Sequence, residues 1–229
     1  MENNEDLIAE YKKITSDISI KKKELFKKIQ NASLDIIADH IIKDSNICVM
    51  LSCPGEDELL NRKVAFGQTG KNILSLFKII NSILLENNES FIFDTDSDQY
   101  QFSIINAYNH VYFREVNQAE PDENLIKEKN NIKRIEDSLK EITNLKYLVI
   151  CGNNAEIAFN ALKIKTDAKK AFVSHLGNVG IRNKYKNSFL YDGHNRIDSL
   201  PNEERDKKRF ELIATEVINQ WRENEEEKK

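Results

Sequence analysis

The sequence predicts a three-layer α/β/α fold, in which helices cover both faces of a central, mainly parallel sheet of about four strands. Four short apolar runs end abruptly at turn residues, as strands buried on both faces do. Helical patterns separate these runs, and strands that alternate with helices form parallel βαβ units. The predicted strands are residues 47–51, 102–106, 146–151 and 171–174.

The chain before the first strand is predicted to be a helical extension. Between residues 5 and 44, Leu, Ile and Phe alternate with Lys and Glu at helical spacing, which predicts one or two amphipathic helices. We expect residues 1–44 to pack on a main domain formed by residues 45–229. The first residues are acidic and contain no compact apolar stretch, so we do not expect a signal peptide.

Helical patterns follow the strands. The predicted helices begin near Thr69, Pro121, Ala155 and Pro201. The second of them is long and charged, continues to about Thr143, and has Pro121 in its first turn, where proline is well tolerated. The last helix is expected to end near Trp221. No internal repeat or clear linker divides residues 45–229, so we expect one α/β domain there.

Composition excludes several classes of protein. No run approaches the roughly 18–20 consecutive apolar residues of a membrane span, so no membrane partner is expected. The three cysteines, Cys48, Cys53 and Cys151, are too few and too scattered for a disulfide framework or a paired zinc motif. We therefore expect a reduced, cytoplasmic protein. We also expect a monomer that holds no metal and no cofactor.

Charge is distributed unevenly along the chain. The formal net charge is −4, with acidic residues gathered at both ends. Between residues 160 and 190, by contrast, Asp167 is the single acid among many bases. A local basic face on an acidic protein can still hold a phosphate backbone, although Lys-rich loops are also often merely solvated. The bases are Lys163, Lys165, Lys169, Lys170, Arg182, Lys184 and Lys186.

Polar and turn residues follow each predicted strand at its carboxyl end, where open parallel sheets bind their ligands. These segments are Ser52-Cys53-Pro54-Gly55, Asn106-Ala107-Tyr108-Asn109-His110, Gly152-Asn153-Asn154 and His175-Leu176-Gly177-Asn178. An Asn amide can read the edge of a base, and a His can donate a hydrogen bond to a developing anion. Taken one at a time, each is also compatible with an ordinary turn, a strand end or a structural His.

Together, these segments resemble the uracil-DNA glycosylase superfamily. Residues 51–58 (LSCPGEDE) and 64–74 (VAFGQTGKNIL) resemble the branch whose motifs run Gly-Glu-Ala-Pro-Gly and Pro-Phe-Val-Gly-x-x-Gly-x-x-Leu. Asn106 falls at the family's Thr-Asn strand end, and residues 147–155 resemble its strand-Leu-Gly-x-x-Ala segment. His175 falls at its His-Pro-Ser motif. The resemblance covers about residues 45–220 and implies the same fold.

The resemblance also implies roles for individual residues. Phe66 would stack on the flipped base, Asn106 would read its polar edge, and His175 would donate to its carbonyl oxygen as it departs. Pro54 and Gly55 would complete the base pocket. From the charge asymmetry beside His175, we expect DNA to bind the basic stretch between Lys163 and Lys186, with Arg182, Lys184 and Lys186 nearest the backbone and with Gly177 and Asn178 in contact with it. We expect Cys53, Pro54, Phe66, Asn106 and His175 to converge beyond the strand ends.

The sequence departs from the family at several positions. Ser52 and Cys53 stand where the family places the acidic or amide residue that holds the attacking water, and neither is a carboxylate or an amide. Ser52, Cys53 and Glu56 are the candidates for the catalytic role at this position. Activation of the water by Asp57 or Glu58 stays open, as does a larger contribution from His175 and the DNA phosphates. The His-Pro-Ser tripeptide is replaced by His175-Leu176-Gly177. No Cys-x-x-Cys occurs, so the iron–sulfur cluster of the resembling branch is not expected.

The function that this resemblance implies is that of a DNA glycosylase. Such an enzyme would hydrolyse the N-glycosidic bond of a flipped-out uracil or modified pyrimidine and leave an abasic site. Ordinary repair and defence against phage with modified DNA both stay open, as does the identity of the base. Two other classes also stay open: a non-catalytic DNA-binding module with this fold, and a nucleotide-binding α/β protein that acts on a free small molecule.

Overall fold

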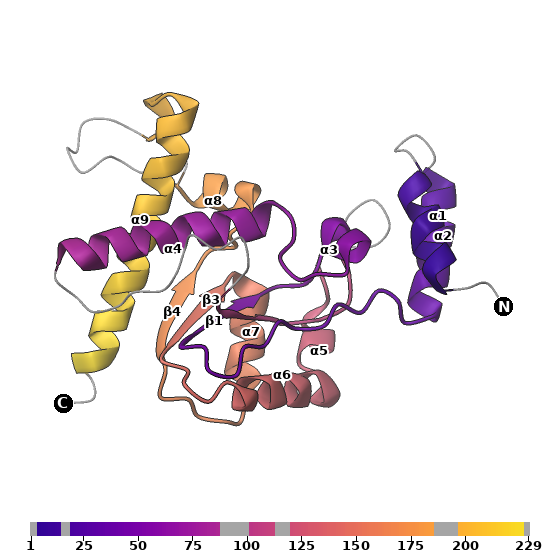
Figure 1. The fold of residues 1–229 in the computed structure, drawn as a ribbon, viewed down its shortest axis with the longest axis horizontal. Coiled ribbons are helices and arrows are strands. Elements are labelled where there is room, and N and C mark those ends of the chain that lie inside the picture. The colour runs from indigo at the N-terminus through magenta and orange to yellow at the C-terminus, as the bar shows by residue number, and fades with distance from the viewer. Residues whose placement is uncertain (1–3, 15–18, 88–100, 113–119, 186–196, 227–229) are drawn as a thin grey trace.

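A four-stranded, all-parallel sheet forms the centre of the protein, in the order β2-β1-β3-β4 (Figure 1). The computed structural model describes residues 4–14, 19–87, 101–112, 120–185 and 197–226. The strands are β1 (Ile47–Leu51), β2 (Ser103–Asn106), β3 (Tyr147–Cys151) and β4 (Lys169–Val173). The predicted α/β/α class and its four parallel strands are thereby confirmed.

Two hydrophobic cores lie on opposite faces of the sheet because successive side chains of a strand point to opposite sides. Val49 packs with residues of α4 (Gln68–Glu86) and α9 (Asn202–Glu226). Its neighbour Met50 packs with residues of α6 (Lys129–Glu141) and α7 (Asn153–Ala161). The unbroken apolar run of β1 is therefore explained by burial on both faces.

The prediction of one long charged helix after Pro121 is wrong, because this segment forms two helices, α5 (Glu123–Ile126) and α6. Glu128 has an extended backbone and precedes the first turn of α6. The Asn131 side-chain amide donates to the carbonyl oxygens of Ile126 and Ala107, at 2.7 Å each. Asn131 thus ties the end of α5 to the segment that leaves β2.

The sequence analysis does not predict two short helices. Each begins shortly after a strand, in a segment with the turn residues of a loop. These are α3 (Glu56–Asn61), after β1, and α8 (Asn178–Tyr185), after β4. Their positions matter for function, since both begin at the carboxyl edge of the sheet, where the polar segments were predicted to gather.

β4 begins two residues earlier than predicted, at Lys169. It is the last strand of the sheet, and α9 covers its outer edge with amide side chains. The Phe172 N–H donates to Gln220 at 2.8 Å, and Gln220 donates back to the Phe172 carbonyl at 3.0 Å. Asn224 bonds in the same two-way manner to Lys170, at 3.5 and 3.4 Å.

The chain that precedes β1 starts with two helices, α1 (Asn4–Lys13) and α2 (Ser19–Asn31), whose apolar side chains share a core with the main domain. The segment that follows lies antiparallel to the outer side of β2, with bridges between Ile36 and His110 and between His40 and Ile104. Residues 36–40, placed by prediction in the helical extension, therefore border the sheet itself. No helix in the described ranges has the length and apolar content to cross a membrane.

Candidate functional site

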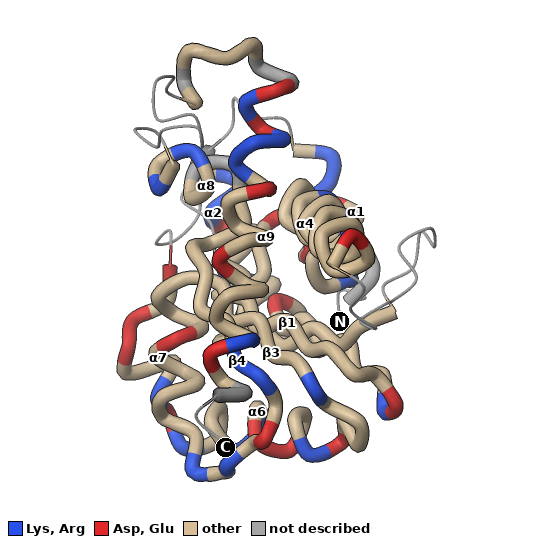
Figure 2. Tube along the Cα trace, turned by 90° about the vertical axis from the view of Figure 1, so that its left-hand side faces the viewer, with Lys and Arg blue, Asp and Glu red and all other residues tan. Residues whose placement is uncertain are grey.

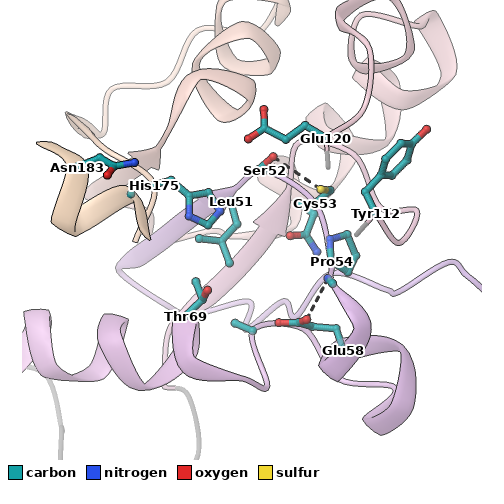
Figure 3. Close-up of a pocket in the computed structure, with 14 residues that line it drawn as sticks. Leu51, Ser52, Cys53, Pro54, Glu58, Thr69, Tyr112, Glu120, His175 and Asn183 are labelled. Carbon is teal, nitrogen blue, oxygen red and sulfur yellow. Dashed lines mark hydrogen bonds between the residues drawn. The ribbon is translucent and has the colours of Figure 1, made fainter. Parts of the chain in front are cut away.

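A pocket of about 530 Å³ opens at the carboxyl ends of the strands, between the segments that leave β1, β2 and β4 (Figure 3). Its lining comes from residues far apart in the sequence because parallel strands end at the same edge of a sheet. Its size falls within the range of small-molecule sites. Six of the residues assigned to the site line it, Ser52, Cys53, Pro54, Gly55, Asn106 and His175, as does Glu58, named above as an alternative for activating the water.

Asn106 is the last residue of β2, and its backbone is held on both sides. Its N–H donates to Asp39 Oδ1 at 3.0 Å, and its carbonyl accepts from Arg134 Nη2 at 2.6 Å. The side chain lines the pocket, is only 1% exposed, and carries an Nδ2 with no hydrogen-bond partner. An unpaired buried amide costs about 1–3 kcal/mol, so Asn106 is well suited to bind a polar ligand.

His175 follows β4 and is held in one tautomer. The Gly177 N–H donates to His175 Nδ1 at 2.9 Å, so Nδ1 acts as the acceptor and the ring proton sits on Nε2. His175 is open to solvent at the pocket, yet the surrounding atoms still lower the pKa of the imidazole by desolvation, while Glu120 opposes this. The ring is therefore a neutral N–H donor at neutral pH.

Glycines surround His175 because side chains would collide with it. A Cβ on Gly177 would lie 2.9 Å from Nδ1, and one on Gly180 would meet the His175 backbone carbonyl. Gly152 has a φ of +86°, and a Cβ there would lie 3.2 Å from the His175 Cβ. The sequence pointed to Gly152 and Gly177 as turn residues but not to Gly180, since α8 was not predicted.

Cys53 and Ser52 are linked to a buried amide of α7. The Ser52 hydroxyl donates weakly to Cys53 Sγ at 3.7 Å and accepts from Asn154 Nδ2 at 2.9 Å. Burial raises the pKa of the Cys53 thiol to about 11. A protonated thiol is a poor proton acceptor, so Cys53 does not fit the task of activating water and instead forms a small wall of the pocket.

Glu56 and Glu58 of α3 are already engaged in other contacts. Glu56, which we predicted as a catalytic residue, lies outside the pocket lining, accepts from the Tyr11 hydroxyl at 3.0 Å, and pairs with Lys22 at 2.6 Å. Glu58 does line the pocket, but it accepts the Gly55 N–H at 2.9 Å, and burial raises the pKa of its carboxyl. Glu56 is therefore directed to the N-terminal helices and not to the site.

The structure does not bring Phe66 into the pocket lining, where we predicted its ring face; the side chain is 47% exposed. The aromatic residue of the lining is Tyr112, from the segment after β2. Its ring lies edge-on to Tyr108 at 5.9 Å, and Tyr108 stacks on His110 at 5.0 Å. Tyr112 was missed, although the run Tyr108, His110, Tyr112 beyond a strand end was visible in the sequence.

The predicted basic face is divided between two ends of the sheet. Arg182 and Lys184 are exposed on α8, two of whose other residues line the pocket, and Figure 2 shows the basic segments of α8 beside α9. Lys184 pairs with Glu216 of α9 at 2.7 Å. Lys169 stands at the opposite, amino end of β4, roughly 13 Å along the strand from Val173. Lys186 lies outside the described residues, as does the Asn178 side chain.

Comparison with models of protein families and with curated proteins gives no match for this sequence. Within the described residues, no group of three or more His, Cys, Asp or Glu is placed to hold a metal ion. The pocket, with its unpaired amide and its neutral imidazole, is therefore the candidate site of function.

Proposed function

We propose that the protein is a DNA glycosylase that hydrolyses the N-glycosidic bond of a flipped-out uracil or modified pyrimidine and leaves an abasic site. One observation carries this proposal: a buried, unpaired amide and a neutral imidazole N–H line the same pocket. Asn106 supplies the amide and His175 the imidazole. These two groups match the two polar needs of a departing pyrimidine, recognition of its edge and stabilisation of its charge.

The reaction requires a base outside the duplex, because the glycosidic bond cannot be reached inside the stack. Asn106 reads the polar edge of the flipped base with its side-chain amide. As the bond between C1′ and the base nitrogen breaks, the electron pair leaves with the base, and the His175 Nε2–H donates to its carbonyl oxygen. Removing a donor of this kind costs roughly 2.7–4 kcal/mol of barrier in comparable sites.

The small side chain of Cys53 in the pocket lining leaves room for a pyrimidine that carries a substituent. A small protonated thiol stands where a larger side chain would narrow the pocket, whose volume is about 530 Å³. We therefore propose modified pyrimidines as substrates beside uracil. The biological context that we propose is DNA repair or defence against phage with modified DNA. Either context implies a cytoplasmic location, where that DNA is found.

A panel of labelled duplex oligonucleotides tests the proposal. Each carries one uracil, 5-methyl-, 5-hydroxymethyl- or glycosylated pyrimidine, and alkali cleaves the strand wherever a base has been removed. We expect strand cleavage for at least one substrate with the wild-type protein and its loss in His175→Ala. Asn61→Ala, a change on the exposed end of α3 outside the pocket lining, serves as the matched control.

Two other outcomes of the panel would overturn the proposal in different ways. Tight DNA binding without cleavage of any substrate indicates a non-catalytic module that shares the fold. Absence of DNA binding, together with a rise in melting temperature on adding free nucleosides or nucleotides, indicates a protein that acts on a small molecule.

A further inference from the structure

We infer that Glu120 is the carboxylate that orients and deprotonates the attacking water, held in place by the amide of Asn154. This inference rests on the proposed glycosylase function and answers a question that the sequence left open. Ser52 and Cys53 carry neither a carboxylate nor an amide, and Glu56 lies outside the pocket lining.

Two carboxylates line the pocket among the described residues, those of Glu58 and Glu120. Glu58 belongs to the start of α3, where it accepts the Gly55 N–H at 2.9 Å, so its oxygen is used to hold the backbone. Glu120 instead precedes α5 and is exposed to the solvent that would supply the water. Figure 3 shows its carboxylate above Ser52.

The Asn154 side chain connects Glu120 to the rest of the site. Asn154 Nδ2 donates to Glu120 Oε2 at 3.2 Å and to Ser52 Oγ at 2.9 Å. Asn154 is buried at the first turn of α7, so it gives the carboxylate a fixed anchor. The Asn154 N–H bonds to one lone pair of the Glu120 carboxylate, so other lone pairs can accept a hydrogen bond from a water molecule.

The charge of Glu120 reaches the groups that surround the reacting centre. Burial lowers the pKa of the His175 imidazole and raises the pKa of the Cys53 thiol; the negative charge of Glu120 opposes the first shift and adds to the second, so it acts on groups that line other parts of the same pocket. A negative charge in this position favours the cation-like sugar that forms as the base departs. The same carboxylate can therefore act on the sugar and on the water.

The proposed step is a balanced hydrolysis. The C1′–N bond breaks with both electrons leaving on the base, whose carbonyl oxygen accepts the His175 Nε2–H hydrogen bond. Water oxygen forms the new bond to C1′, and its proton passes to the Glu120 carboxylate and from there to solvent. The anionic base takes a proton from solvent as it is released. No oxidant, metal or cofactor enters the step.

Single-turnover excision with the best substrate of the panel tests the assignment. We expect Glu120→Gln to slow excision by about 10²-fold or more, the usual range for loss of a general base, with DNA affinity within about twofold of wild type. Glu123→Gln, in the next exposed stretch and outside the pocket lining, should retain the wild-type rate. Formate should restore the rate of Glu120→Ala at least tenfold, because it can occupy the vacated space, while chloride should not.

Several results would overturn the inference without touching the proposed function. Wild-type excision with an unchanged Glu120→Gln rate would reject Glu120, and a large loss in Glu58→Gln alone would assign the role to Glu58. Slower excision without formate rescue, together with a lower melting temperature, would reduce Glu120 to a structural residue. Lack of excision by the wild type itself would instead overturn the glycosylase proposal.

Discussion

At the scale of the single residue, His175 depends on the absence of side chains around it. Gly152, Gly177 and Gly180 leave room for its ring and backbone, and the Gly177 N–H selects its tautomer. A neutral imidazole so held is already oriented before any ligand arrives. Preorganised donors of this kind act mainly where charge develops, in the transition state.

We therefore expect His175→Ala to slow base excision by about 10²-fold or more while DNA affinity changes little. Single-turnover excision and binding titrations would measure the two effects, and thermal melting would reveal any loss of stability. A variant with wild-type excision would contradict the role, and a variant that loses binding, stability and excision together would indicate a structural His.

Tyr112 and Phe66 are alternative candidates for the residue that stacks on the flipped base. Only Tyr112 lines the pocket, so Tyr112→Ala should weaken capture of the flipped base by about tenfold, given the roughly 1–3 kcal/mol of one stacking contact. Phe66→Ala should have a smaller effect. Fluorescence of 2-aminopurine beside the target base reports flipping in both variants. The reverse order would restore the role that the family resemblance assigns to Phe66.

At the scale of the element, β2 ends in a polar clamp. Asp39 accepts the Asn106 N–H at 3.0 Å, while Arg134 of α6 pairs with Asp39 and donates to the Asn106 carbonyl at 2.6 Å. Ser138 also donates to Asp39, at 3.1 Å. Burial raises the pKa of Asp39, and Arg134 opposes this rise. The position of the reading amide therefore depends on a segment before β1 and on a helix after β2.

Removing Arg134 should be costly because it leaves Asp39 buried without its cation. We expect Arg134→Ala to lower the free energy of unfolding by on the order of 3 kcal/mol and to slow excision through Asn106. Lys133→Ala is the matched control, since Lys133 makes an exposed pair with Asp137 and should leave stability near the wild-type value. Urea unfolding measures both. Equal effects of the two substitutions would show that the clamp contributes little.

The strands were predictable because a strand that is buried on both faces needs apolar residues at successive positions, which gives a short apolar run in the sequence. The break between α5 and α6 was not, because it depends on Asn131 bonding to Ala107, a contact between segments distant in sequence. The site shows the same division. Asn106 ends a strand and His175 follows one closely, so both were predicted, whereas Tyr112 and Glu120 lie farther along the chain from β2 and were not.

At the scale of the whole molecule, the described residues of the predicted basic face fall into two groups. One group lies on α8, of which other residues line the pocket, and the other lies near the amino end of β4. Under the proposed function, we expect a DNA strand whose base enters the pocket to lie near the first group. The field at the contact, and not the net charge of −4, then decides binding.

We accordingly expect Arg182→Glu to weaken DNA binding, and Lys165→Glu, beyond α7 and before β4, to change it little. Binding should also fall linearly in a plot of log affinity against log salt, with a shallower slope for Arg182→Glu, because each phosphate contact releases counterions. Titrations by fluorescence anisotropy at several salt concentrations measure both. Salt-independent binding, or equal losses in the two variants, would rule out a phosphate contact on α8.

Both lateral edges of the central sheet are occupied in the described part of the chain. Residues 36–40 lie along β2, and the amides of Gln220 and Asn224 engage the outward backbone of β4 at Phe172 and Lys170. An open edge is a template on which another chain can add a strand, which leads to aggregation. In this protein, a strand from another chain would first have to displace the hydrogen bonds that residues 36–40, Gln220 and Asn224 make at these edges. Gln220 and Asn224 thus occupy backbone groups of β4 that a strand from another copy of the chain would need for pairing.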